Sequence, residues 1–254
     1  MSSSFASRVR GIHHRYGDVH ALSGVDLELR RGEVTALVGA NGSGKTTLLR
    51  ILAGIVTPSA GEVEVLGTGR LTREDRRRVG YVSQDPALDP EMTGAETLTF
   101  LAALYGVRRS RRRQRVVEQA AAFGVASYLS RQVGGWSGGM RRRLHLAAGM
   151  IHDPELLLLD EPTAGLDPEG RELLWTDLEA RAARGWAVAI VTHDLAAAEG
   201  HAGTVVILDR GALVAAGTPA ELVAADGAAD LAAAFRRRTG RDVTDLLPRK
   251  ERRR

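Results

Sequence analysis

The chain of 254 residues contains no cysteine, which excludes disulfide bonds, thiolate nucleophiles and cysteine-ligated zinc or iron–sulfur centres. A reducing compartment such as the cytosol is the simplest location for a chain of this kind. No apolar run approaches the roughly 18 residues that a membrane-spanning helix needs, and residues 1–10 lack the apolar segment of a secretory signal. We therefore expect the chain by itself to be soluble.

Lysine is also scarce, because Lys45 and Lys250 are the only two in a chain that otherwise uses arginine. The 35 basic and 31 acidic residues give a formal net charge of +4. This small excess is spread along the chain, so charge does not favour specific nucleic-acid binding. With 44% hydrophobic and 26% charged residues, the composition is that of a globular protein large enough to bury its own core.

Strand-like and helix-like segments alternate along the chain, which predicts an α/β fold with a largely parallel central sheet. Residues 34–38, 156–159 and 187–191 are uninterrupted apolar runs, as expected for strands that are covered on both faces. Weaker strand signals at 62–66 and 79–83 predict an antiparallel portion nearer the N-terminus.

Several helices are predicted from capping patterns at their N-termini. These patterns are Thr93 with Glu96, Asp167 with Pro168, and Thr218 with Pro219 and Glu221. Residues 85–151 are mostly helical in pattern, which predicts a helical subdomain inserted between strands, and 204–208 with 212–216 predict a hairpin. Beyond residue 224 the alanine- and arginine-rich sequence predicts one short amphipathic helix and a frayed basic tail.

A phosphate-binding motif follows the first apolar strand. Residues 39–46 read Gly-Ala-Asn-Gly-Ser-Gly-Lys-Thr, the pattern G-x-x-x-x-G-K-[ST], between a predicted strand and a predicted helix. Its glycines let backbone N–H groups turn toward a phosphate, and the helix N-terminus adds partial positive charge. Lys45 would supply a full charge to the β- and γ-phosphates, and Thr46 a hydroxyl ligand for Mg²⁺. The alternative is a glycine-rich turn with an incidental lysine, which this setting disfavours.

Two acidic residues end the second apolar strand. Asp160 and Glu161 follow residues 156–159, at the carboxyl edge where ligands of open α/β sheets bind. Asp160 would hold Mg²⁺, directly or through water, and Glu161 is the candidate general base for the attacking water. The alternative for Glu161 is a purely solvated side chain.

With five further features, the chain resembles the nucleotide-binding subunits of ATP-binding cassette (ABC) transporters. Residues 136–140, Trp-Ser-Gly-Gly-Met, resemble the ABC signature, and residues 164–167, Ala-Gly-Leu-Asp, resemble the D-loop. Gln84 resembles the Q-loop glutamine, His193 the switch histidine, and Tyr16 the aromatic residue that stacks on adenine.

The resemblance covers about residues 9–223 and implies an α/β P-loop NTPase with the ABC-ATPase fold. This fold has a RecA-like parallel-sheet core, an N-terminal antiparallel β-subdomain and an inserted α-helical subdomain. The implied domains are an ABC ATPase domain over 1–223, followed by a C-terminal helix and basic tail over 224–254. The implied ligands are ATP and Mg²⁺, and the implied activity is Mg-dependent ATP hydrolysis.

The resemblance also implies a set of site residues. The nucleotide contacts would be Tyr16, Gly39, Asn41, Gly42, Ser43, Gly44, Lys45, Thr46, Thr47, Ser137, Gly138, Gly139 and Asp167. The metal ligands would be Thr46, Gln84 and Asp160, and the catalytic residues Glu161, His193 and Gln84. Each of these residues also has an ordinary structural alternative. Ser137 could serve merely as a helix cap, His193 could be a surface histidine, and Tyr16 could be a packing residue.

The resemblance further implies partners. Two subunits, identical or paralogous, would pack head to tail, so that Ser137 and Gly139 of one close over the γ-phosphate held by Lys45 of the other. Hydrolysis would then open the dimer, and this two-state switch would perform work on separate transmembrane permease subunits. The implied location is cytoplasmic, peripheral on the inner face of the cell membrane.

The signature departs from the commonest Leu-Ser-Gly-Gly-Gln sequence. Met140 followed by Arg141, Arg142 and Arg143 resembles the Ser-Gly-Gly-Met-Arg-Arg pattern of drug-efflux ABC exporters of the daunorubicin-resistance type. The leading hypothesis is therefore the ATPase subunit of a multidrug-type exporter. Because three arginines in a first helical turn oppose the helix dipole, we hypothesise that they raise the positive potential facing the partner's ATP.

Two other functions remain open, a soluble ABC ATPase for protein or cluster assembly and the ATPase of a nutrient importer. A DNA-repair ATPase is disfavoured because the interval between Lys45 and Ser137 is short and has no heptad run. Residues 108–115, with six arginines, are interpreted as a solvated helix face or loop. Contact with anionic lipid headgroups is the alternative for this segment.

Overall fold

Two β-sheets organise the fold in the computed structural model, which describes residues 4–242 and 246. A six-stranded sheet has the order β5-β6-β7-β3-β8-β9, and a three-stranded sheet has the order β2-β1-β4. The strands are β1 (Phe5–Tyr16), β2 (Val19–Arg30), β3 (Glu33–Val38), β4 (Ala60–Val65), β5 (Val79–Val82), β6 (Leu156–Asp160), β7 (Ala187–Val191), β8 (Thr204–Asp209) and β9 (Ala212–Gly217).

The six-stranded sheet is parallel from β5 to β8, and β9 pairs antiparallel with β8. This arrangement confirms the predicted parallel core and the predicted late hairpin. Every residue of β6 and β7 is buried, which explains why both strands appear in the sequence as uninterrupted apolar runs.

The three-stranded sheet is antiparallel, with β1 pairing β2 on one side and β4 on the other. It confirms the predicted N-terminal antiparallel subdomain and includes the expected strand near residues 62–66. The placement of residues 79–83 in this antiparallel portion was wrong, because β5 pairs parallel with β6 in the large sheet. A short apolar strand carries no sequence signal for its partner, so its sheet could not be predicted from its own residues.

Helices and short 3₁₀ turns cover the sheets. The α-helices are α1 (Lys45–Leu52), α2 (Gly94–Leu104), α3 (Arg109–Ala122), α4 (Gly138–Gly149), α5 (Pro168–Ala182), α6 (Leu195–His201), α7 (Pro219–Ala225) and α8 (Leu231–Thr239). The 3₁₀ turns are Asp75–Arg78, Ala126–Tyr128 and Val133–Gly135. Among the described residues, no helix combines the length and the hydropathy required to cross a membrane.

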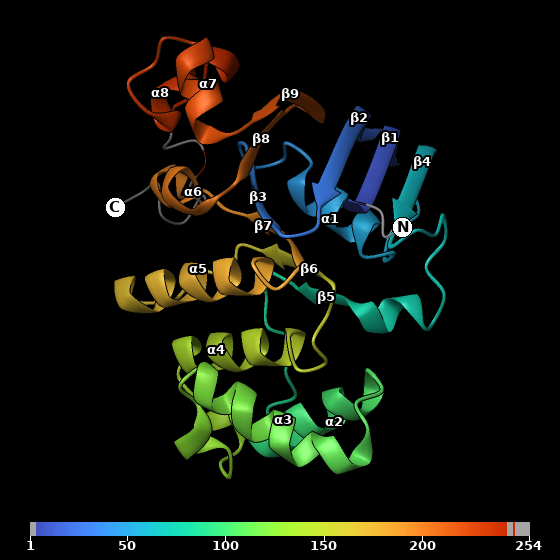
Figure 1. Cartoon of the computed structure of the whole chain (residues 1–254), viewed down its shortest axis with the longest axis vertical. Coiled ribbons are helices and arrows are strands. Elements are labelled where there is room, and N and C mark those ends of the chain that lie inside the picture. The colour runs from blue at the N-terminus through green and yellow to red at the C-terminus, as the bar shows by residue number, and fades with distance from the viewer. Residues whose placement is uncertain (1–3, 243–245, 247–254) are drawn as a thin grey trace.

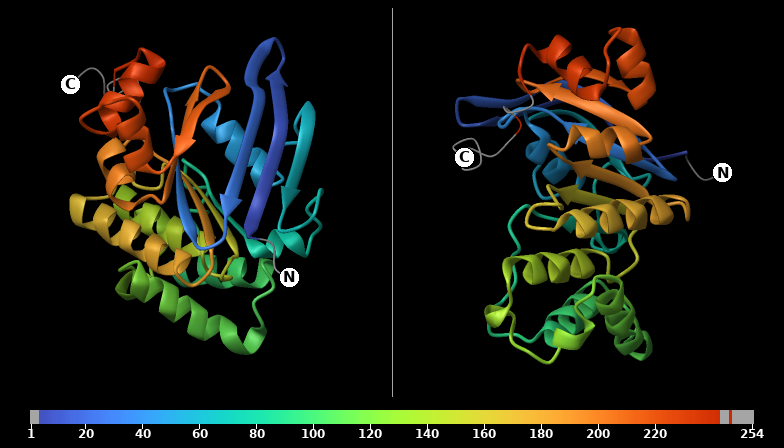
Figure 2. Two further views of the ribbon diagram at one scale, coloured as in Figure 1. Left: turned by 45° about the horizontal axis from the view of Figure 1, so that its top comes forward. Right: turned by 90° about the vertical axis from the view of Figure 1, so that its left-hand side faces the viewer.

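A helical group formed by α2, α3 and α4 lies between β5 and β6 in the chain and has a hydrophobic cluster of its own. Figure 1 shows this group at one end of the molecule, with α7 and α8 at the opposite end. The two views in Figure 2 keep the same separation. This arrangement confirms the predicted insertion of a helical subdomain into the α/β core.

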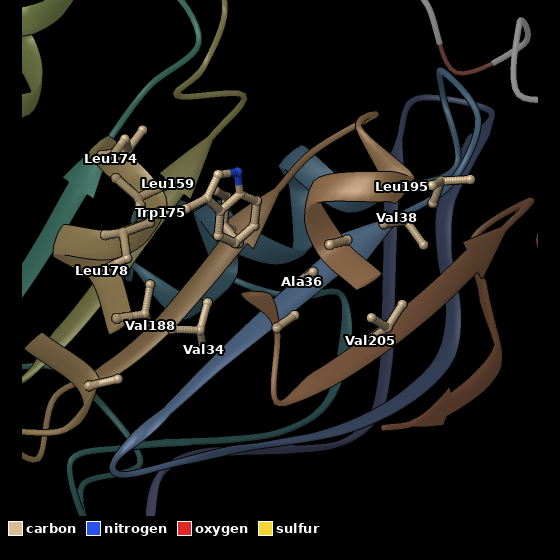
Figure 3. Packing of buried hydrophobic residues seen from close by; sticks show 14 of the residues in the cluster. Val34, Ala36, Val38, Leu159, Leu174, Trp175, Leu178, Val188, Leu195 and Val205 are labelled. Atoms are coloured by element: carbon tan, nitrogen blue, oxygen red, sulfur yellow. The ribbon is translucent and has the colours of Figure 1, made fainter. Parts of the chain in front are cut away.

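The main core fills both faces of the large sheet. On one face, Trp175 of α5 packs over Val34 and Val188, and Leu195 of α6 lies near Val38 (Figure 3). Phe235 of α8 belongs to the same cluster, so the C-terminal helix covers the core. On the other face, α1 and the antiparallel sheet build a second cluster.

The three predicted caps are present. Thr93 and Thr218 each form a complete capping box, and the Asp167 carboxylate accepts from the N–H of Gly170 at the start of α5. The predicted C-terminal helix is α8, whereas most of the predicted basic tail, residues 243–245 and 247–254, lies outside the described residues.

Candidate functional site: a phosphate-binding loop and two carboxylates

The phosphate-binding loop connects β3 to α1, as the sequence predicts. Gly44 caps α1 with a positive φ of 102°, a conformation that favours glycine. A Cβ atom at Gly44 would lie 2.5 Å from the Ala21 carbonyl oxygen and 2.7 Å from Leu22 Cδ2. A Cβ atom at Gly39 would lie 2.1 Å from the Leu208 carbonyl oxygen. The loop can therefore be this tight only with glycine at both positions.

Lys45 points back into the loop. Its Nζ donates to the carbonyl oxygens of Gly39 at 2.6 Å and Ala40 at 2.9 Å, and to Ser43 Oγ at 3.4 Å. Burial lowers the pKa of Lys45 to about 8, an effect that the charges of Glu161 and Asp160 partly oppose. A buried ammonium held on loop carbonyls is a full positive charge placed where an anion would bind.

Thr46 and Asp160 join the loop to the end of β6. Thr46 Oγ1 donates to Asp160 Oδ1 at 3.2 Å, so a hydroxyl and a carboxylate face one point. These are oxygen ligands of the kind that Mg²⁺ prefers, and each is supplied by a separate element. Burial raises the pKa of Asp160, while the hydrogen bond from Thr46 lowers it. The donor set therefore fits a magnesium ion that also binds phosphate oxygens.

Gln84 and Glu161 are brought together although they are 77 residues apart. Gln84 follows β5, Glu161 follows β6, and Gln84 Nε2 donates to Glu161 Oε2 at 3.1 Å. Glu161 is 8% exposed and adopts a left-handed φ of 47°, uncommon for a residue other than glycine. Its N–H donates to the Val191 carbonyl oxygen at 3.0 Å, which fixes this turn against β7. Strained backbone of this kind occurs at functional sites.

The segment that resembles the ABC signature begins α4. Ser137 Oγ accepts from the Met140 N–H at 3.2 Å, so the capping role of Ser137 is confirmed. Ser137 and Gly138 are exposed, and Gly139 is partly buried. Asp167, in the segment that resembles the D-loop, accepts from Arg143 at 3.1 Å and thereby links α5 to α4.

The two remaining expected site residues are His193 and Tyr16. His193 follows β7, and its buried Nδ1 has no hydrogen-bond partner among the described residues. Tyr16 ends β1 with 46% of its surface exposed, and its ring packs edge-on against His14 at a centroid distance of 4.6 Å. An exposed ring at this place is available for stacking. The roles expected for both residues stay predictions.

The three arginines after Met140 lie in three different environments. Arg141 is exposed and donates to the Trp136 carbonyl oxygen, and Arg143 pairs with Asp167. Arg142 is only 2% exposed and donates to main-chain carbonyls around Asp160. Arg142 therefore does not reach the surface where a partner would bind, and the hypothesis that the three arginines raise the positive potential facing the partner's ATP stays a prediction. No sequence signal distinguishes Arg142 from its two neighbours, because its partners come from distant segments.

A phosphate-binding loop that meets two strand-end carboxylates defines the class of P-loop nucleoside-triphosphate-binding proteins. A family model described as "ABC transporter" matches residues 22–164. The chain belongs to the ABC transporter family, in which it is an ATP-binding subunit that hydrolyses ATP.

Relatives support this assignment. The daunorubicin resistance ATP-binding protein DrrA3 of Streptomyces coeruleorubidus is 41% identical over 87% of this chain and 71% of its own length. The Nod factor export ATP-binding protein I of Burkholderia orbicola (strain AU 1054) is 36% identical over 87% of this chain and 74% of its own. A solved ATP-binding subunit of an ABC transporter is 30% identical with a TM-score of 0.82, covering 87% of this chain and 93% of the other.

Proposed function

We propose that this subunit drives an ABC exporter of the multidrug type. The proposal is supported by relatives named for daunorubicin resistance and for Nod factor export. The sequence Ser-Gly-Gly-Met-Arg-Arg in the signature segment, which resembles that of drug-efflux exporters, also supports it. The exported compound would be handled by the membrane subunits.

We assign the chemistry to the contacts around β6. Lys45 and the loop N–H groups bind the β- and γ-phosphates, with Asn41, Thr47 and the loop glycines forming the cradle. Thr46 and Asp160 would hold Mg²⁺, with Gln84 as a further ligand, and the bound ion would neutralise phosphate charge. Glu161 accepts the proton of the attacking water, His193 contacts the γ-phosphate, and Tyr16 stacks on adenine. The observation that carries this assignment is the pair of bonds Thr46–Asp160 and Gln84–Glu161.

A second subunit would complete the site. Ser137 and Gly138 are exposed at the N-terminus of α4, where the helix dipole favours an anion. Ser137 Oγ is already engaged with a main-chain N–H of its own helix, as in an ordinary cap. We propose that this N-terminus, with Gly139, closes over ATP bound to the Lys45 of another copy or of a paralogue. Asp167 would lie at the same interface.

Separate membrane subunits would bind near Gln84 and α2. Phe100 and Leu104 are one helical turn apart on α2 and remain 57% and 55% exposed. Two large exposed apolar side chains on one face suit the apolar side of a partner helix. The subunit would then lie in the cytoplasm, peripheral on the inner face of the cell membrane.

The arginine-rich start of α3 would contact anionic lipid headgroups beside that partner. Arg108, Arg109, Arg111 and Arg113 are exposed, and the first turn of α3 contains no acidic residue. Basic groups near an anionic surface contribute about 1 kcal/mol each. We further propose that residues 1–223 form the ATPase domain, with the segment over 224–254 appended to it.

The variant Glu161→Gln tests the proposed catalytic role and the dimer together. It should bind ATP, hydrolyse it slowly and elute from a sizing column as a dimer only when ATP is present. Glu118→Gln, a change of an exposed glutamate on α3, is the control and should behave like the wild type. Wild-type turnover in Glu161→Gln would remove Glu161 as the base, and a monomer with bound ATP would refute the sandwich.

Co-expression tests the proposed exporter. A neighbouring reading frame that encodes about six apolar spans should yield a membrane protein that retains this subunit in purified membranes. Replacing both Phe100 and Leu104 by serine should release the subunit while ATP affinity stays unchanged. A gene neighbour that encodes a periplasmic binding protein would indicate an importer instead, and stable complexes with soluble proteins alone would indicate an assembly ATPase.

A further inference from the structure

Arg142 is an almost fully buried arginine in the second turn of α4. Its side chain is 2% exposed, and all five of its N–H groups can be matched with main-chain carbonyl oxygens. Nε donates to Pro162, Nη1 to Ser83 and Gln84, and Nη2 to Asp160 and Glu161, at distances of 2.5 to 3.1 Å. Within the described residues no carboxylate forms an ion pair with Arg142, so its fixed contacts are with the backbone.

The carbonyls belong to the residues that the proposed mechanism uses. Gln84 and Glu161 are bonded through their side chains at 3.1 Å, and Asp160 accepts from Thr46 at 3.2 Å. Arg142 bonds the main chain of Gln84, Asp160 and Glu161 at the same time. The turn at Glu161 has a left-handed φ of 47°, which the surrounding structure must hold in place. The guanidinium therefore holds together the main chain of the three residues Gln84, Asp160 and Glu161.

The same guanidinium belongs to α4, the helix that Ser137 caps. Arg142 is part of α4, so a displacement of that helix would pull on the carbonyls of Gln84 and Glu161. Only a guanidinium has five donors in one plane, whereas a lysine ammonium has three and a glutamine amide has two.

We infer that Arg142 is a positioning residue for ATP hydrolysis. It fixes the backbone beneath Gln84, Asp160 and Glu161, and it connects that backbone to the helix that Ser137 caps. This inference rests on the proposed function, because it presupposes that Gln84, Asp160 and Glu161 carry the chemistry. Arg142 touches neither the phosphate-binding loop nor Lys45 in the contacts described above. Its loss should therefore slow turnover far more than it weakens ATP binding.

The test compares Arg142→Gln with Arg142→Lys and with a buried arginine elsewhere. Arg181 of α5 is 7% exposed, bonds Asp177 at 2.6 Å and lies 4.8 Å from the Trp186 ring centroid. Arg181→Gln thus matches Arg142→Gln in chemistry and burial but leaves the site contacts intact. Four quantities are measured on the full chain: ATP dissociation constant, kcat, KM and hydrogen exchange of the peptide that spans residues 160–166.

We expect Arg142→Gln to bind ATP within about threefold of wild type while kcat falls by about tenfold or more. Hydrogen exchange should rise over 160–166 in this variant and not in Arg181→Gln, whose kcat per folded molecule should stay within about twofold. Arg142→Lys should keep the ATP affinity with an intermediate kcat, and it decides the test if Arg142→Gln does not fold.

Three results would overturn the inference. These are wild-type kcat in Arg142→Lys and Arg142→Gln, a loss of ATP affinity as large as the loss of kcat, and an equal loss of kcat in Arg181→Gln. Failure of the proposed function is distinguishable, because then the wild type itself would show no ATP turnover or Glu161→Gln would keep full activity.

Discussion

Acid should destabilise this fold through two partly buried histidines near the junction of α4 with β5. His152 stacks on Tyr105 at a ring distance of 4.0 Å, and its Nε2 lies 3.2 Å from the Val79 carbonyl oxygen. Burial lowers the pKa of His145 and of His152 from 6.5 to about 4. Both histidines are therefore neutral in the folded protein at neutral pH.

The lowered pKa values of the two histidines determine how the stability of the fold changes with pH. Because the folded pKa lies below the unfolded value of 6.5, the unfolded chain binds more protons as the pH falls. Each histidine stabilises the fold above pH 6.5, and that contribution is lost between pH 6.5 and about 4. At 1.36 kcal/mol per pKa unit, the loss at pH 5 is about 2 kcal/mol for each histidine.

Urea unfolding of wild type and His152→Gln at about pH 7.5 and about pH 5 measures this loss. Glutamine retains a donor for the Val79 carbonyl oxygen and does not titrate. The fall in unfolding free energy between the two pH values should be smaller by about 2 kcal/mol in His152→Gln than in wild type. His20→Gln, a change of an exposed histidine, should leave the fall unchanged. Equal falls in wild type and His152→Gln would refute the reasoning.

Three further changes test the loop, a cap and the core. Gly44→Ala should weaken ATP binding by about tenfold or more in equilibrium titration, because its Cβ would lie 2.5 Å from the Ala21 carbonyl oxygen. Gly42→Ala, whose Cβ would have nothing within 4 Å, should lose less ATP affinity. Thr93→Ala should lower stability by about 1 kcal/mol in thermal denaturation, and an unchanged melting temperature would count against the cap. Phe235→Ala, at a side chain that is 0% exposed, should cost about 3 to 5 kcal/mol in urea unfolding while ATP affinity is retained.

Local patterns made much of the fold predictable. The buried strands β3, β6 and β7 appear as apolar runs, and the starts of α2, α5 and α7 appear as caps, because in each case the signal lies within a few residues. The partner of β5 depends on a pairing with a strand more than 70 residues away, so its sheet was mispredicted. The strands β1 and β2 were not predicted, because irregularities in their pairing interrupt the alternation of apolar and polar residues.

The site residues also differ in how far they could be predicted, because some lie in contiguous motifs and others are defined by distant partners. The loop over 39–46 and the pair Asp160 and Glu161 are contiguous motifs, so sequence alone identified them as candidates. The bond between Gln84 and Glu161 agrees with the placement of Gln84 by position. Arg142 could not be singled out, because a buried arginine is recognised only by its acceptors, and these come from two other segments.

Mixing two inactive variants tests the central claim most directly, namely that ATP is enclosed by the loop of one copy and Ser137 of another. Lys45→Ala disables the loop and Ser137→Ala disables the closing helix, so neither homodimer contains an intact site. A mixed dimer pairs the loop of the Ser137→Ala copy with the helix of the Lys45→Ala copy, which restores one site. An equal mixture should therefore recover about a quarter of wild-type ATP turnover if both copies associate at random. Turnover in the mixture no higher than in the separate variants, beside an active wild type, would contradict the account.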